Sequence, residues 1–112
     1  MPFVNATVNL DLTQDQQSAL TLAIHAVIKS ALGKPDGYIA VNLNISKNLI
    51  FAKKNLPCAV IQVQAVGGGG QAAAASGITK ALAEYGVEAD RVFVNFQSFS
   101  GKDWAMGGSL FG

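Results

Sequence analysis

The chain contains one pattern twice: an alternating apolar segment, an amphipathic helical segment and a second alternating segment. The first copy spans residues 2–45 and the second spans residues 58–97. Alternation places every second side chain on one face of a strand, whereas apolar residues three and four apart indicate a helix. The sequence therefore predicts an α/β fold in which two βαβ units form a four-stranded mixed sheet with two helices on one face.

Turn and cap signals give the boundaries of these predicted elements. Thr13 and Gln16 form a capping-box pattern before the first helix, which ends at Gly33. The second helix ends at Gly86. A loop region with room for a short strand at 49–51 separates the two copies. The predicted strands are residues 2–10, 38–45, 58–66 and 91–97, and the second helix is residues 71–85.

The predicted sheet face away from the helices is polar but carries no charge. A face exposed to solvent normally carries Lys, Glu and Thr, so amide side chains indicate a wet surface enclosed within an oligomer. The overall composition agrees, because 50% of the residues are hydrophobic and only 13% are charged. The polar residues of this face are Asn5, Thr7, Asn9, Asn42, Asn44, Gln62, Gln64, Asn95 and Gln97.

Length and composition exclude several classes of protein. With 112 residues the chain is predicted to be a single domain, residues 1–112. Its net charge of +1 gives no indication of a basic surface for binding nucleic acid, and no apolar run reaches transmembrane length. Cys58 is the only cysteine, which leaves no internal disulfide and no cysteine-based zinc site. No signal peptide is visible, so the expected location is the cytoplasm.

Pro2 stands directly before the first predicted strand. Removal of Met1 would make it an N-terminal secondary amine on a backbone that the ring holds rigid. Burial in an apolar pocket disfavours the charged form of an amine and lowers its pKa toward neutrality, where it can act as a general base. The alternative is that Met-Pro is an ordinary beginning without functional meaning.

Two further motifs admit two interpretations each. Residues 67–72 match a dinucleotide-binding glycine pattern, but four consecutive glycines match it almost automatically, and a flexible connector is favoured. Lys34 follows the stop of the first helix and is held between Gly33 and Pro35. It can present a fixed positive charge to a carboxylate, or it can compensate the helix dipole; the two roles are compatible.

Taken together, short segments along the whole chain resemble the macrophage migration inhibitory factor family of the tautomerase superfamily. Their order and spacing are specific, although each segment is weak alone. The matching segments are Met1-Pro2 opening a strand, Leu32-Gly33-Lys34-Pro35, Tyr38-Ile39-Ala40-Val41, Leu56-Pro57-Cys58-Ala59, Val66-Gly67, Asp90-Arg91-Val92 with Asn95, and Gly108-Ser109-Leu110-Phe111.

The resemblance implies a homotrimer with active sites between subunits and the amide-rich faces around a central channel. It implies that Pro2 is the catalytic base and that Lys34 binds the substrate carboxylate. It further implies that Val66 contributes a backbone N–H and that Asn95 comes from a neighbouring subunit. The aromatic pocket implied by the resemblance consists of Phe3, Tyr38, Phe93 and Phe111.

Three positions depart from the family pattern. Phe93 replaces a tyrosine of many members, so a phenol donor is missing. Met106 replaces a tryptophan, with Trp104 two residues earlier. The Cys-x-x-Cys of mammalian members becomes residues 58–61 with a single cysteine, which gives no support to thiol oxidoreductase activity.

The leading hypothesis is a keto–enol tautomerase that acts on small aromatic α-keto acids such as phenylpyruvate. No metal or organic cofactor is expected, because fixed donors stabilise the enol. The rival hypothesis is a cytokine-like interaction protein with a vestigial pocket, a protein receptor and export without a signal peptide. A scaffold without pocket chemistry is a third hypothesis, which requires that Met1 is retained.

Overall fold

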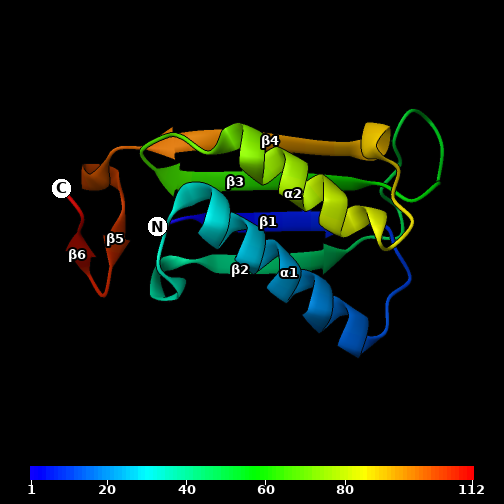
Figure 1. The fold of residues 1–112 in the computed structure, drawn as a ribbon, viewed down its shortest axis with the longest axis horizontal. Coiled ribbons are helices and arrows are strands. Elements are labelled where there is room, and N and C mark those ends of the chain that lie inside the picture. Colours follow the sequence, from blue (N-terminus) through cyan, green and yellow to red (C-terminus); the bar gives the residue numbers. More distant parts are fainter.

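A computed structural model describes all of residues 1–112. Its main sheet has four strands, β1 (Phe3–Val8), β2 (Ala40–Ile45), β3 (Ala59–Val66) and β4 (Val92–Phe99). Two helices, α1 (Gln14–Leu32) and α2 (Gln71–Ala83), cover one face of this sheet and leave the other face open (Figure 1). The predicted α/β fold with two helices on one face is confirmed.

Each helix connects two parallel strands, as in a βαβ unit. Across the sheet the order is β2-β1-β3-β4, with β1 parallel to β2, β3 parallel to β4, and β1 antiparallel to β3 at the centre. The register places Phe3 opposite Gln64, so the start of β1 and the end of β3 share one end of the sheet. The N-terminus and the C-terminal segment lie at this same end (Figure 1).

The hydrophobic core lies between the helices and the covered face of the sheet. Helix α1 begins at the predicted capping box, in which the Gln16 N–H donates to Thr13 Oγ1 and the Thr13 N–H donates to Gln16 Oε1. Burial of a leucine or isoleucine side chain contributes about 1.5–3 kcal/mol. The buried core residues of the two helices are Leu20, Ile24, Ile28, Ala74, Ile78 and Leu82, and those of the central strands are Val4, Ala6, Val8, Ala59, Ile61 and Val63.

The open face carries the predicted amide side chains, and they form hydrogen bonds across the strands. Asn5 Oδ1 accepts hydrogen bonds from Asn42 Nδ2 at 2.9 Å and from Asn44 Nδ2 at 3.1 Å. Asn5 Nδ2 donates to Gln62 Oε1 at 3.4 Å. Neighbouring amides thus satisfy one another on a face that carries no charged side chain.

Asn9 is the exception on this face. It lies beyond the end of β1, where its Nδ2 donates to the Leu56 carbonyl at 2.8 Å and its Oδ1 accepts from the Cys58 N–H at 2.9 Å. The sequence placed Asn9 among the open-face amides but did not predict that its side chain binds the chain before β3. Its side chain holds the loop of residues 46–57 because the carbonyls and N–H groups of that loop lie within reach.

The C-terminal residues form more structure than the sequence predicts. Strand β4 continues to Phe99, and β5 (Ala105–Met106) and β6 (Ser109–Leu110) form a hairpin. Its turn residues Gly107 and Gly108 have φ values of 60° and 84°. Glycine adopts such values at both turn positions without strain, as a type I′ turn requires. The hairpin stands beyond the sheet, beside the N-terminus (Figure 1).

Two local predictions need correction. The expected strand at 49–51 is a single bridge between Phe51 and Lys54, because the chain turns back at Ala52 and Lys53. Residues Asp36–Tyr38 form a short 3₁₀ helix, so β2 begins at Ala40 rather than at Tyr38. None of the helices combines the length and the apolar character that a membrane span requires.

Candidate functional site

An apolar cavity of about 220 Å³ lies where β1 begins, between that strand and the C-terminal hairpin. Pro2 borders the cavity with its side chain fully buried, and its carbonyl accepts a hydrogen bond from the Ala40 N–H at 3.0 Å. The first residues of the chain are therefore fixed against the start of β2. The remaining lining residues are Met1, Phe3, Gly37, Tyr38, Ile39, Ala40, Trp104, Ala105, Met106 and Phe111.

Aromatic rings form much of the cavity wall. The Tyr38 and Phe111 rings lie edge to face, with centroids 6.1 Å apart and an interplanar angle of 83°. Trp104 is held in the same way by Phe99, at a centroid distance of 5.3 Å and an angle of 78°. Such pairs contribute about 0.5–1.5 kcal/mol beyond the area that they bury. The wall is consequently a preformed apolar surface suited to a planar ring.

The amino terminus at this cavity lies in an environment that favours its neutral form. Partial burial, and after it the positive charge of Lys34, lower the pKa of the Met1 amino group below its ordinary value. Both effects penalise an ammonium ion at this position. Lys34 does not line the cavity, but it follows the C-cap of α1 at Gly33, and its charge acts on the chain terminus from there.

The predicted site residues fall into two groups within one chain. Pro2, Phe3, Tyr38 and Phe111 line the cavity, Lys34 acts on its amino group, and Val66 ends β3 at the same end of the sheet. Phe93 and Asn95 lie on β4 toward the opposite end, opposite Val60 and Gln62 respectively.

The register shows how far apart the two groups lie. Asn95 is level with Gln62 and Asn5, which is three residues along the sheet from Pro2 and two strands across. At about 3.3 Å per residue and about 4.8 Å per strand, the separation is roughly 10 Å in each direction. Phe93 lies two residues further away, where its ring packs against Phe51 at a centroid distance of 4.6 Å. One chain alone does not bring Phe93 or Asn95 to Pro2.

Sequence reasoning did not assign Trp104 and Met106 to the cavity wall. The hairpin that carries Met106 was not predicted, so its approach to the N-terminus could not be foreseen. The available signal was that Met106 stands in the position of the family's tryptophan, with Trp104 two residues earlier. Met106 is 53% exposed, and its flexible thioether gives this part of the wall an adaptable surface.

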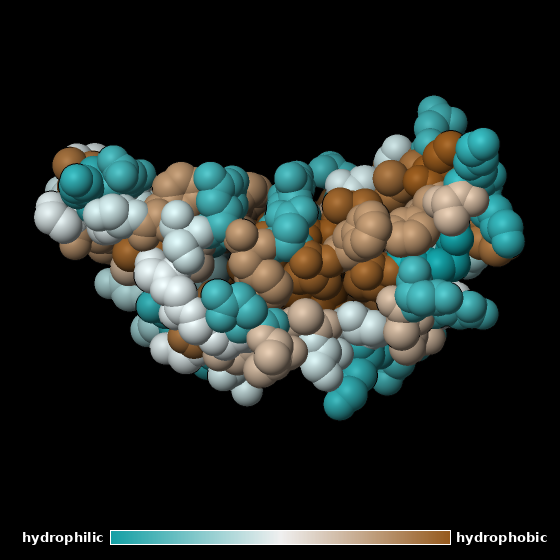
Figure 2. Space-filling model, turned by 90° about the horizontal axis from the view of Figure 1, so that it is seen from above, coloured by the Kyte–Doolittle hydropathy of each residue, from teal (hydrophilic) through white to brown (hydrophobic).

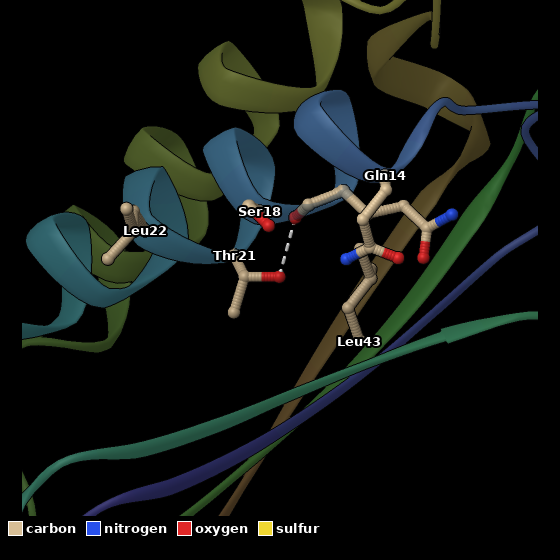
Figure 3. Close-up of a pocket in the computed structure, with 6 residues that line it drawn as sticks. Gln14, Ser18, Thr21, Leu22 and Leu43 are labelled. Atoms are coloured by element: carbon tan, nitrogen blue, oxygen red, sulfur yellow. Dashed lines mark hydrogen bonds between the residues drawn. The ribbon is translucent and has the colours of Figure 1, made fainter.

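A second cavity, of about 350 Å³, lies between α1 and β2 (Figure 3). The residues around it are Gln14, Gln17, Ser18, Thr21, Leu22 and Leu43. Thr21 Oγ1 donates to the Gln17 carbonyl at 2.7 Å, the bond drawn in Figure 3. No lining side chain titrates near neutral pH, so this cavity lacks a group that could move a proton. The cavity at Pro2, in contrast, is bordered by the amino terminus, whose pKa is lowered.

Comparison with known proteins gives the family to which this fold belongs. The family model of macrophage migration inhibitory factor matches residues 1–112, the whole chain. The chain belongs to the macrophage migration inhibitory factor family. The macrophage migration inhibitory factor homolog of the nematode Brugia malayi is 28% identical over 116 residues, which cover 100% of both chains. The recognition made from the sequence segments is thus confirmed.

Solved structures share the fold of this family. The macrophage migration inhibitory factor-like protein of Entamoeba histolytica superposes with a TM-score of 0.91 at 24% identity, covering 98% of each chain. A protein solved after inactivation by 2-oxo-3-pentynoate superposes with a TM-score of 0.87 at 18% identity, covering 97% of this chain and 95% of the other. Because both identities are below 25%, these two likenesses establish the fold of this chain alone.

Proposed function

We propose that this family member is a keto–enol tautomerase that acts on small aromatic 2-oxo acids such as phenylpyruvate. Membership of the family and its fold support a tautomerase or macrophage migration inhibitory factor-like function in general. One observation carries the finer proposal: Pro2 is fully buried at an aromatic-walled cavity, beside an amino terminus whose pKa burial and Lys34 lower.

Removal of Met1 is part of the proposal, because it frees the Pro2 nitrogen as a secondary amine. The neutral amine takes a proton from the carbon beside the ketone, and the resulting prolinium returns a proton to the oxygen of the enolate. The net reaction moves one proton from carbon to oxygen, and its reverse follows the same path. Lys34 attracts the carboxylate, and the Val66 N–H is a further donor. Phe3, Tyr38 and Phe111 enclose the aromatic ring.

The proposed protein is a homotrimer in which Asn95 and Phe93 of one subunit reach the cavity of the next. Within one chain, Phe93 and Asn95 lie too far from Pro2 to share its cavity. In this assembly, the part of a neighbouring sheet that carries Phe93 and Asn95 reaches that cavity. The choice of substrate class is prompted by a protein of the same fold that was inactivated by 2-oxo-3-pentynoate, which is itself a 2-oxo acid. A 2-oxo acid presents a carboxylate to Lys34 and an acidic carbon to Pro2.

An interaction protein with weak tautomerase activity is the second candidate. Phe93 has no hydroxyl near the base, and Met106 leaves one wall of the cavity flexible and 53% exposed. Both features reduce the fixed polar contacts that a transition state requires. In this case the cavity serves recognition by a protein receptor, and export without a signal peptide is the expected route.

Changes at the amino terminus separate the two candidates. Pro2→Gly keeps an amine but makes it primary and loosens the backbone, so kcat/KM for phenylpyruvate should fall about 100-fold, in the range that a general base contributes. An alanine inserted before Pro2 acylates the nitrogen and should abolish turnover. Mass spectrometry of the wild-type chain establishes whether Met1 is absent, and circular dichroism checks the fold. Wild-type rates in the alanine-extended protein would eliminate Pro2 as base, and a wild type with little or no turnover would favour the interaction protein.

A further inference from the structure

Arg91 is a buried cation that has no acidic partner. Only 9% of the residue is exposed, and it stands directly before β4. All the hydrogen bonds of its guanidinium go to backbone carbonyls: Nε donates to Pro57 at 3.0 Å, Nη1 to Phe51 at 3.1 Å, and Nη2 to Lys54 and Leu56 at 3.2 Å each. A buried charge is costly unless hydrogen bonds satisfy it, so this geometry must be maintained.

These four carbonyls belong to one loop, which needs outside support. Residues 51–54 turn back on themselves through two backbone hydrogen bonds between Phe51 and Lys54, at 3.2 and 3.1 Å. The central residues Ala52 and Lys53 have φ values of 55° and 62° without being glycine. A left-handed conformation costs such residues about 1–2 kcal/mol each. Arg91 is the side chain that holds this strained turn in one arrangement.

The same guanidinium fixes a pair of aromatic rings. It lies 5.3 Å from the centroid of the Phe51 ring, and that ring packs against Phe93 at 4.6 Å and an angle of 47°. Phe93 is nevertheless 61% exposed, which is unusual for a ring held so closely. Asn95 follows two residues later and faces the same side of the sheet. Arg91 therefore orders a surface that stays largely exposed in the single chain even though Phe51 packs against Phe93.

We infer that Arg91 is a positioning residue that acts across a subunit interface. Through Phe51 it fixes the Phe93 ring and the start of β4. These complete the wall of the cavity around Pro2 of a neighbouring subunit. The inference rests on the proposed function, because it takes the shared site of the homotrimer as its setting. Arg91 itself touches neither the substrate nor the Pro2 nitrogen. Its effect is on the substrate-binding wall of a cavity in another chain.

Kinetics of single variants give the first test. Arg91→Lys keeps the charge but loses the planar fork that reaches several carbonyls. It should lower kcat/KM for phenylpyruvate about 10-fold, mainly through KM, because an aromatic wall binds the ring before and during the reaction. Phe51→Ala leaves the four carbonyl acceptors in place and should have the same effect. Lys47→Ala removes a charge from the same loop and should leave kcat and KM unchanged.

Mixed trimers give the decisive test. Chains carrying Pro2→Gly and chains carrying Arg91→Lys are coexpressed with different tags, and trimers that contain both are purified. In a trimer that contains both chains, one of the three sites receives an intact Pro2 from one chain and an intact Arg91 from its neighbour, so the purified mixed trimers should show about one third of wild-type activity. The separate parent proteins mixed without exchange should show only their average. Phe51→Ala replaces Arg91→Lys if the latter does not assemble.

Each outcome has one meaning. Recovery to about one third supports action across the interface, because damage confined to the fold of one chain is not repaired in this way. Activity that stays at the average of the parents overturns the inference. A wild-type protein without phenylpyruvate activity, or an active alanine-extended protein, contradicts the proposed function instead.

Discussion

Lys34 gives the candidate site its electrostatic character. The positive charge next to the amino terminus lowers the pKa of that amine, second in effect to burial. If Lys34 is replaced by methionine, an ammonium ion at the terminus is penalised less, and the pKa of the amine rises. With Met1 removed, the same effect is expected for the Pro2 amine, whose neutral form then prevails only at higher pH. The kcat/KM profile of Lys34→Met should therefore rise at higher pH than that of the wild type.

The same substitution removes the proposed contact with the substrate carboxylate. KM for phenylpyruvate should increase more than kcat decreases, because the contact is present before and during the reaction. Lys29→Met is the matched control: it removes an equal charge from the same end of α1, where Lys29 pairs with Asp36 at 3.0 Å. An unshifted pH profile with unchanged KM in Lys34→Met would refute both roles.

At the residue scale, the sequence predicted the residues that line the cavity better than the residues that hold loops in place. Pro2, Tyr38 and Phe111 were predicted because residue type and family pattern point to them. Asn9 and Arg91 were not, because their partners are backbone carbonyls more than 30 residues away in sequence. Every loop has backbone carbonyls, whatever its sequence. The residue types of a loop therefore do not indicate which distant side chain will bind it.

The two helices meet at a residue whose small size is required. A Cβ atom added to Gly77 of α2 would lie 2.6 Å from Val27 Cγ1 of α1. Valine is stiff at χ1 in a helix and cannot easily move away. Gly77→Ala should therefore lower the free energy of unfolding by up to about 2 kcal/mol, since overpacking costs about 1–3 kcal/mol and the gain in helix propensity is roughly 1 kcal/mol.

Chemical denaturation at one fixed protein concentration measures this effect, because assembly makes apparent stability depend on concentration. A second substitution isolates its cause. With Val27→Ala in the background, the added methyl group has room, and Gly77→Ala should become neutral or stabilising. If Gly77→Ala destabilises both backgrounds equally, contact with Val27 is not the reason.

At the scale of elements, the periodic segments were predicted well and their ends less well. The apolar spacing of Leu20, Ile24 and Ile28 and the capping box define α1 within a residue of its observed start. The end of α2 at Ala83 falls short of the predicted Tyr85, because the hydrogen bonds tighten there: the Tyr85 N–H donates to the Leu82 carbonyl at 3.0 Å, three residues back. The C-terminal hairpin is too short to show alternation, and only its two glycines signal a turn.

Viewed whole, the molecule leaves several uncharged surfaces uncovered. The amide face of the sheet is open, and large apolar side chains are exposed at both ends: Ile50, Leu56 and Phe93 at one, Tyr38, Met106 and Leu110 at the other. Figure 2 shows apolar atoms along the middle of the β4 edge, with hydrophilic atoms gathered toward both ends. Surfaces of this kind are typical of protein interfaces. A cyclic assembly that brings unlike ends together would cover them.

Ile50 tests that assembly. In an isolated chain it is 58% exposed, and a surface substitution at such a position changes stability by about 0.5 kcal/mol or less. In the proposed trimer the same end of the sheet packs against a neighbour, and Ile50→Glu would bury a carboxylate without a partner there. The wild type should scatter light as about three times the 11.6 kDa chain mass, and Ile50→Glu should scatter as a monomer at micromolar concentration.

Leu22→Glu is the matched control for this prediction. Leu22 is 68% exposed on α1, on the helix side of the sheet, whereas the proposed trimer encloses the opposite, open face. The same change in charge and size should leave that variant trimeric. Loss of tautomerase activity should accompany loss of the trimer in Ile50→Glu, because a monomer retains Pro2 and Lys34 but has no neighbouring Phe93 or Asn95. A monomeric wild type, or a fully active monomer, would refute the shared site and leave the Pro2 cavity to act alone.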